Sequence, residues 1–237
     1  MRFEVLSNSG LVAERAATII ADHAWEAIAS RGFFILGVSG GRTARIMLRW
    51  LAAANIPWRA VHIVQVDERV APIGHKERNL TDLCNSLIDS RLPIDQLYPM
   101  PVESPDLVAA AGYYASTLRN IAGGVPVIDL VHLGVGLDGH TASLVPGDPV
   151  LDIDDADVAL TGPYRGRRRM TLTYPILNRA RNILWVATGQ EKSEIVSRLL
   201  DGDREIPAGR VSSDRALLLA DCPAASRSSQ TGGVAYV

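Results

Sequence analysis

The sequence predicts an α/β protein with three layers, in which a largely parallel, modified Rossmann-like sheet lies between two layers of helices. Two observations predict this αβα fold. Apolar runs of strand length recur along the 237-residue chain and alternate with segments whose apolar residues have helical spacing. Several of these runs end in glycine turns or polar clusters, as parallel strands do where their carboxyl ends carry a binding site. No linker or internal repeat divides the chain, so we expect one domain over residues 1–237, with a partly flexible tail over residues 222–237.

The composition indicates a globular protein without broad affinity for nucleic acid or membranes. Hydrophobic residues make up 47% of the chain and charged residues 21%, and no apolar run approaches the roughly 18 residues of a membrane span. Residues 1–8 contain a glutamate and lead into no apolar segment, so they do not resemble a signal peptide. The net charge of −2 gives no electrostatic reason to expect nucleic acid as a partner. We expect a cytoplasmic protein that is a monomer or a weak homodimer.

The two cysteines, Cys84 and Cys222, lie far apart and show neither Cys-x-x-Cys nor Cys/His metal spacing. We therefore expect free thiols in a reducing compartment. No cluster of histidine, cysteine and carboxylate residues has the spacing of a metal site, so we expect no metal.

The first predicted helix covers residues 11–30 and stops at Gly32, and a buried strand over residues 33–38 follows it. That strand runs directly into a glycine loop and a second helix over residues 44–54. In such an arrangement the loop and helix N–H groups, together with the helix dipole, attract an anion such as phosphate. A simple turn is the alternative for a Gly-Gly pair. The candidate anion-binding residues are Ser39, Gly40, Gly41, Arg42 and Thr43, the last also suited to the helix N-cap.

This loop is neither a Gly-x-Gly-x-x-Gly motif nor a P-loop, so the sequence indicates no dinucleotide, nucleoside triphosphate or other cofactor. The next predicted strand, over residues 61–66, ends on Asp67-Glu-Arg69. Asp67 and Arg69 are site candidates because they follow a strand beside the glycine loop, although such charges also pair as surface ions. A loop over residues 70–78, with His75 on its exposed surface, precedes a helix over residues 79–88.

The segment with the most chemistry follows a predicted helix over residues 106–121 and a strand over residues 130–133. Gly134 and Gly136 make a tight turn, and Asp138 and His140 come directly after it. Histidine exchanges a proton near neutral pH, because its unperturbed pKa is roughly 6.5. A nearby carboxylate can orient the ring. An isolated Asp-Gly-His would be read as a surface turn, but the preceding strand favours an active-site loop.

The remaining elements bring further cations toward this region. A short strand over residues 158–160 precedes the most basic segment, residues 165–169, and the strand-like residues 169–173 could direct Arg169 at an anion. Asn178 and Asn182 bracket a short turn or helix. A buried strand over residues 183–188 then leads into a helix over residues 191–200 with Lys192 in its first turn, and residues 217–220 predict a last strand. Lys192 is either an ordinary surface lysine or a second contact to the anion.

Together these segments resemble the 6-phosphogluconolactonase family, within a wider group that includes glucosamine-6-phosphate deaminases. The matching stretches follow the family's order over most of the chain: residues 39–43, 67–69, 134–143, 169–173 with Asn178, and Gly189 with Lys192. Deaminases of the group carry Ala-Phe-Asn-Glu-Pro after Asp-Gly-His-x, with a glutamate that assists ring opening. Here Thr141-Ala-Ser-Leu-Val-Pro146 contains no acid, which is the lactonase pattern. Two departures are Ala44, where proline is frequent, and Glu77-Arg78-Asn79, which replaces Asp-Ser-Asn.

The resemblance implies hydrolysis of 6-phospho-D-glucono-1,5-lactone, a phosphosugar lactone, to 6-phospho-D-gluconate in the oxidative pentose phosphate pathway. His140 would activate water, and Asp138 would orient the imidazole or hold a substrate hydroxyl. The glycine-loop N–H groups or Arg69 would stabilise the oxyanion, and the exact role of Asp67 stays open. The phosphate would be held by the Gly40–Gly41 backbone with Thr43, Arg169 and Lys192. The alternatives are a deaminase or isomerase of the same fold and a non-catalytic sugar-phosphate sensor.

Overall fold

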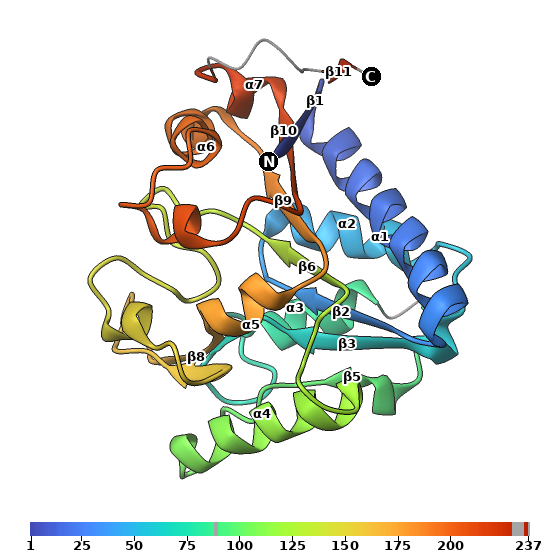
Figure 1. The fold of residues 1–237 in the computed structure, drawn as a ribbon, viewed down its shortest axis with the longest axis vertical. Coiled ribbons are helices and arrows are strands. Elements are labelled where there is room, and N and C mark those ends of the chain that lie inside the picture. Colours follow the sequence, from blue (N-terminus) through green and yellow to red (C-terminus); the bar gives the residue numbers. More distant parts are fainter. Residues whose placement is uncertain (88–89, 229–234, 237) are drawn as a thin grey trace.

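The computed structural model describes residues 1–87, 90–228 and 235–236. Its centre is an eight-stranded sheet in the order β11-β1-β10-β9-β6-β2-β3-β5, with every adjacent pair parallel (Figure 1). The α/β, mostly parallel fold class is therefore confirmed. The strands are β1 (Arg2–Leu6), β2 (Phe34–Val38), β3 (Val61–Gln65), β5 (Leu97–Tyr98), β6 (Leu130–Leu133), β9 (Ile183–Ala187), β10 (Ala216–Asp221) and β11 (Ala235–Tyr236).

Helices connect the strands, as parallel pairing requires. Those of the described residues are α1 (Ser9–Arg31), α2 (Arg42–Ala52), α3 (Asn79–Ser86), α4 (Leu107–Ala122), α5 (Tyr174–Arg179), α6 (Ser193–Leu200) and α7 (Cys222–Ala225). The first helix begins where the side chain of Asn8 accepts a hydrogen bond from the Leu11 N–H, and it ends at Gly32, whose φ is +85°. The predicted limit of α3 at Ile88 lies outside the described residues.

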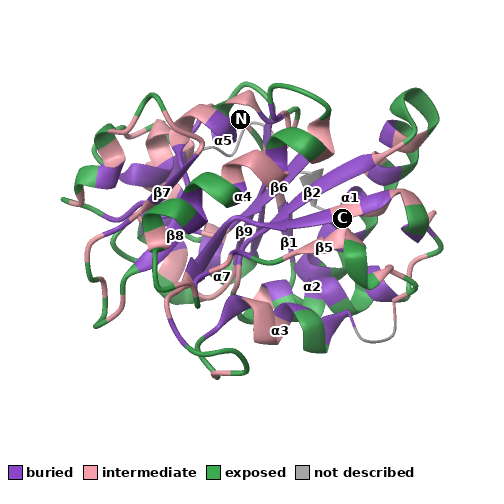
Figure 2. Cartoon of the chain, turned by 90° about the horizontal axis from the view of Figure 1, so that it is seen from below, coloured by how far each residue is buried: buried purple, intermediate pink, exposed green. Residues whose placement is uncertain are grey.

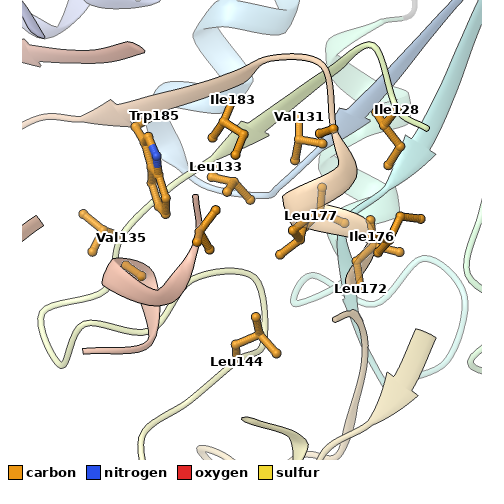
Figure 3. Close-up of a cluster of buried hydrophobic side chains, with 14 of the residues drawn as sticks. Ile128, Val131, Leu133, Val135, Leu144, Leu172, Ile176, Leu177, Ile183 and Trp185 are labelled. Atoms are coloured by element: carbon orange, nitrogen blue, oxygen red, sulfur yellow. The ribbon is translucent and has the colours of Figure 1, made fainter. Parts of the chain in front are cut away.

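Alternate side chains of each central strand pack against different helices, and this produces the three layers. Leu36 and Leu130 face a buried cluster that contains side chains of α1, α2 and α3, whereas Val131 and Leu133 face a second cluster with α4, α5 and α6. Figure 3 shows this second cluster around Leu133, Trp185 and Ile176. In Figure 2 the central strands are buried throughout, while each large helix keeps one exposed side. The central strands read as nearly continuous apolar runs because both of their faces are covered.

A second, smaller sheet was not predicted from the sequence. It is antiparallel, has the order β4-β8-β7, and consists of β4 (Asp67–Arg69), β7 (Val158–Leu160) and β8 (Arg169–Leu172). Figure 1 shows β8 on the side of the molecule away from α1. Val66 alone separates β3 in the large sheet from β4 in the small one. The small sheet thus stands at the carboxyl edge of the large sheet, where the predicted site residues gather.

Part of the tail that was expected to be flexible has regular structure. Asp221 caps α7 by accepting a hydrogen bond from the Ala224 N–H, and Ala235–Tyr236 pairs with β1. Residues 229–234 and 237 of the predicted flexible tail lie outside the described residues.

Candidate active site

A cleft of about 370 Å³ lies at the carboxyl ends of β2, β6 and β9, and the small sheet forms one of its walls. The chain brings nearly all the predicted site residues to this cleft. Eleven of them line it: Ser39, Gly40, Gly41, Arg42, Thr43, Asp67, Arg69, Gly136, His140, Arg169 and Lys192. Asp138 stands directly behind His140. Parallel strands bring segments that are distant in sequence to one edge, and this is how the site is assembled.

The pair formed by His140 and Asp138 is the chemical centre of the cleft. Nδ1 of His140 lies 2.5 Å from Oδ1 of Asp138. Partial burial would raise the pKa of Asp138, but hydrogen bonds from His140 and Tyr164 outweigh it and lower that pKa to about 2. Asp138 is therefore a carboxylate at neutral pH, and Nδ1 of His140 carries the shared proton. The other ring nitrogen, Nε2, remains for proton exchange in the cleft.

Two glycines let the loop bring these side chains together. A Cβ at Gly136 would lie 2.0 Å from Nδ1 of His140, and its N–H already donates to the His140 carbonyl at 2.8 Å. Gly139 has φ +80°, a conformation that favours glycine, and a Cβ there would meet Ile206 at 2.6 Å. Neither position has room for a larger residue. The Gly136 N–H is also excluded as an oxyanion donor while it holds this loop closed.

The glycine loop after β2 leads into α2 two residues earlier than expected. Gly41, at φ +135°, is the N-cap, so the prediction of Thr43 as N-cap is wrong. The hydroxyl of Thr43 instead lies 2.8 Å from that of Thr188 at the end of β9. The side chain of Ser39 is buried, and its Oγ has no hydrogen-bond partner among the described residues. A buried unpartnered hydroxyl beside a helix N-terminus suits an anionic ligand.

Asp67 is held within the protein rather than free in the cleft. Its Oδ2 accepts a hydrogen bond from the hydroxyl of Ser143 at 2.6 Å, and its Oδ1 accepts one from the amide of Asn79 at 3.2 Å. Asn79 in turn accepts a hydrogen bond from Nη1 of Arg69 at 2.7 Å. Asp67 therefore positions the groups on either side of it, which is a more specific arrangement than a surface ion pair with Arg69.

The neighbouring Glu68 organises the start of α3. Its side chain is fully buried, and its carboxylate accepts hydrogen bonds from the backbone N–H groups of Asn79 and Leu80, both at 2.8 Å. It also forms a buried ion pair with Arg78 at 3.0 Å. Arg78 stands where the resemblance leads us to expect serine, and here it links Glu68 to Glu103. No residue of the loop 70–78 lines the cleft, and His75 there is half-buried rather than exposed.

Arg69 and Arg169 lie directly opposite each other across the antiparallel pair of β4 and β8. Burial lowers the pKa of Arg169, and the Nε of its side chain has no hydrogen-bond partner in the described part of the chain. Neither arginine forms a salt bridge with a described carboxylate. Like charges at directly paired positions are destabilising. This pair is therefore a location where an anion would be stabilised.

Lys192 adds a third cation, and Arg42 a more distant one. Lys192 lies in a short 3-10 turn (Gln190–Lys192) before α6, rather than in the first turn of the α-helix as expected. Its Nζ donates to the Val135 carbonyl at 2.7 Å, and burial lowers its pKa. Arg42 is largely exposed and pairs with Glu191 at 3.5 Å. Lys192 thus faces the interior of the cleft and Arg42 its rim.

Sequence reasoning missed several residues that line the cleft or contact the His140–Asp138 pair: Asn79, His132, Tyr164 and Arg165. His132 is buried on β6, its Nδ1 has no partner among the described residues, and burial lowers its pKa to about 4. The only sequence signal for His132 was a polar residue within an apolar strand. Arg165 belongs to the basic segment, of which only the last arginine was selected, and Tyr164 directly precedes that segment.

Within residues 1–87, 90–228 and 235–236, no helix is long and apolar enough to cross a membrane. The same residues contain no group of three or more histidine, cysteine or acidic side chains that could hold a metal ion.

The fold and the cleft define an α/β protein with a histidine–aspartate pair beside a group of cationic side chains. The Glucosamine-6-phosphate isomerases/6-phosphogluconolactonase family matches residues 7–219, so the chain belongs to that family. The 6-phosphogluconolactonase of Rattus norvegicus is 38% identical over 212 residues, which cover 85% of this chain and 79% of the relative.

Solved structures agree on the fold but not on one activity. A 6-phosphogluconolactonase from Trypanosoma brucei superposes with a TM-score of 0.84 at 23% identity, over 95% of this chain and 97% of that one. A monomeric glucosamine-6-phosphate deaminase superposes with a TM-score of 0.82 at 20% identity, over 96% of this chain and 100% of that one. The fold alone therefore does not distinguish the two reactions.

Proposed function

We propose that this protein is a 6-phosphogluconolactonase that hydrolyses 6-phospho-D-glucono-1,5-lactone to 6-phospho-D-gluconate in the oxidative pentose phosphate pathway. The observation that carries the proposal is the cationic wall of Arg69, Arg169 and Lys192, in the same cleft as the His140–Asp138 pair. A substrate with a phosphate at one end and an acyl carbon at the other uses both features. The similarity to lactonases at 38% identity also supports it.

In the proposed mechanism, His140 acts as a general base through Nε2. It removes a proton from water as the water oxygen bonds to the lactone carbonyl carbon, and it later protonates the ring oxygen as the ring C–O bond breaks. Asp138 holds the imidazole with its proton on Nδ1, because its Oδ1 lies 2.5 Å from that nitrogen. Both carboxylate oxygens of Asp138 are occupied, since Oδ2 accepts from Tyr164, which favours the orienting role over contact with a substrate hydroxyl.

Negative charge on the carbonyl oxygen requires donors. The Gly136 N–H is engaged with the His140 carbonyl, so Arg69 is the better candidate of those considered. Only Nη1 of Arg69 donates to protein acceptors among the described residues, namely Glu77 and Asn79. The rest of the guanidinium is available to the reacting oxygen.

The phosphate is proposed to bind between the glycine loop and the cations. This part of the cleft is lined by the N-terminus of α2, the buried Ser39 hydroxyl and Arg169. Lys192 adds a further positive charge. Anchoring the phosphate far from the reacting carbon aligns that carbon with His140 and converts binding energy into orientation. No step of this mechanism requires a metal or a cofactor.

The chemistry of the loop after His140 argues against a deaminase. Two residues that follow His140, Thr141 and Ser143, are buried and carry hydroxyl groups. The segment 141–146 contains no acid that could assist ring opening. A sensor would bind the phosphosugar without turnover.

We also propose a cytoplasmic protein that is a monomer or a weak homodimer. Cys84 and Cys222 are exposed and unpaired, which suits a reducing compartment. Light scattering after gel filtration and cell fractionation test the two statements.

The decisive assay compares the hydrolysis of freshly generated lactone by native protein, His140→Ala, His23→Ala and buffer, because such lactones also open unaided. His23 is the matched control, since it lies on α1 outside the cleft. We expect native protein and His23→Ala to outpace buffer greatly, and His140→Ala to approach the buffer rate while keeping its circular dichroism spectrum. If native protein matches buffer, the proposal fails, and ammonia release from glucosamine 6-phosphate is the next assay.

A further inference from the structure

Tyr164 contacts the His140–Asp138 pair from a different part of the chain. It lies in the connection between β7 and β8, in a tight hairpin where Tyr164 and Arg167 form an isolated antiparallel bridge. The two residues at its tip, Arg165 and Gly166, have φ angles of +52° and +78°. Turns with two positive φ values match the twist of the flanking strands, but they are strained for a residue such as arginine. Strained backbone of this kind is found where a functional group must be presented.

The phenol group of Tyr164 completes the hydrogen bonding of Asp138. Its hydroxyl donates to Oδ2 of Asp138 at 2.8 Å, while Oδ1 of the same carboxylate faces Nδ1 of His140. The hydroxyl is also 3.5 Å from that nitrogen, and the two rings meet edge to face with centroids 5.4 Å apart. A carboxylate that is held at both oxygens cannot rotate away from the imidazole without losing a hydrogen bond.

The ring of Tyr164 also contacts two cationic side chains of the cleft. The guanidinium carbon of Arg169 lies 4.8 Å from the ring centroid, and that of Arg165 lies 5.3 Å from it. Both distances fall within the range of cation–π attraction. One side chain therefore contacts the acid–base pair through its hydroxyl and the anion-binding arginines through its ring.

From these contacts we infer that Tyr164 is a positioning residue of the reaction, which fixes the Asp138 carboxylate through its hydroxyl and places Arg165 and Arg169 through its ring. The inference rests on the proposed function as far as the rate is concerned. The low pKa of Asp138 supports it, because the hydrogen bond from Tyr164 is among those that outweigh partial burial. The titratable group that faces Asp138 from its own loop is His140, and the charged group near it from another element is Lys192.

Two substitutions separate the roles of hydroxyl and ring. Tyr164→Phe removes only the hydroxyl, so we expect kcat to fall about 10-fold while KM for the lactone stays within about twofold. Tyr164→Leu also removes the ring, so we expect a similar fall in kcat together with a rise in KM. Tyr113→Phe is the matched control and should match native protein in both constants, because Tyr113 is exposed on α4 and outside the cleft.

A readout independent of activity is the ionisation of Asp138 and the tautomer of His140, followed by carboxyl ¹³C and ring ¹⁵N NMR. In Tyr164→Phe we expect the pKa of Asp138 to rise and the Nδ1–H tautomer to lose population. Unchanged kcat and unchanged NMR titrations in a folded Tyr164→Phe protein would overturn the inference. If native protein lacks lactonase activity, the proposed function fails, while the NMR titrations still decide whether Tyr164 positions Asp138.

Discussion

Nδ1 of His140 and Oδ1 of Asp138 lie 2.5 Å apart in a loop where a single residue, Gly139, separates them in sequence. The Asp138 carboxylate also accepts from the His140 backbone N–H at 3.3 Å, so the loop is closed by side chain and backbone together. A short-range contact of this kind fixes the imidazole before any substrate binds. The proposed general base is therefore preorganised, and its orientation can be tested by changing Asp138 alone.

Asp138→Asn should lower kcat by about 10² to 10⁴-fold, because an amide nitrogen facing Nδ1 favours the tautomer with the proton on Nε2. That tautomer cannot accept a proton from water. The measurement is the steady-state rate of lactone hydrolysis, with Asp22→Asn on the exposed face of α1 as the control. A kcat within twofold of native for Asp138→Asn would show that Asp138 does not orient the base.

Gly136→Ala should abolish most activity without unfolding the protein. Its Cβ would lie 2.0 Å from Nδ1 of His140 and 2.6 Å from Oδ1 of Asp138, so the pair must move apart. The control is Gly112→Ala within α4, where a Cβ meets nothing within 4 Å and alanine is the better helix former. Thermal melts and kinetics should separate the two variants, and an active Gly136→Ala protein would contradict the geometry of the loop.

Arg169→Gln should weaken substrate binding and, in the absence of ligand, leave the protein as stable as native or more so. The substitution removes a buried charge opposite Arg69, and it also removes the proposed contact of Arg169 with the phosphate. We expect KM to rise about 10-fold or more, since hydrogen bonds to charged groups contribute roughly 1.5–3 kcal/mol. Arg168→Gln, at the adjacent exposed position, is the control for KM and for the melting temperature. A large loss of stability in Arg169→Gln would mean that Arg169 serves the fold instead.

His132→Leu should change how stability depends on pH. Burial lowers the pKa of His132 from 6.5 to about 4, so between these values the unfolded chain binds a proton that the folded chain does not. Native stability should therefore fall as pH decreases from 6.5 toward 4, by at most about 1.4 kcal/mol per pH unit for this group. Urea unfolding of native protein and His132→Leu at pH 7 and pH 5 measures the difference. If native protein and His132→Leu lose the same free energy of unfolding between pH 7 and pH 5, His132 is not the source of the pH dependence.

The sequence was informative where local patterns decide the structure. Leu130, Val131 and Leu133, the apolar residues of β6, predicted that strand with its observed limits. The sequence did not predict β1, whose alternating polar residues resemble no buried strand, and it did not predict the two-residue β5. Strands at or next to the edge of a sheet depend on their partners more than on their own residues.

The same distinction holds within the cleft. Residues in the segments that follow predicted strands, such as Asp67 and His140, were identified because parallel strands collect their carboxyl ends at one edge. Tyr164 and Asn79 act through contacts that only the small antiparallel sheet and the start of α3 create. The N-cap of α2 was predicted two residues too late, at Thr43, because Gly41 adopts a φ that only glycine takes readily and the helix begins directly after it.

Val66 joins the two sheets by hydrogen bonds on both of its sides. Its N–H donates to the Val38 carbonyl in the large sheet at 3.0 Å, and its carbonyl accepts from the N–H of Leu172, the last residue of β8 in the small sheet, at 2.8 Å. The contact of Asp67 with Ser143 spans 76 positions of the chain, so it forms only after such long-range pairing. Refolding kinetics should therefore separate two events, with helical signal returning early and enzymatic turnover returning last, when the small sheet docks.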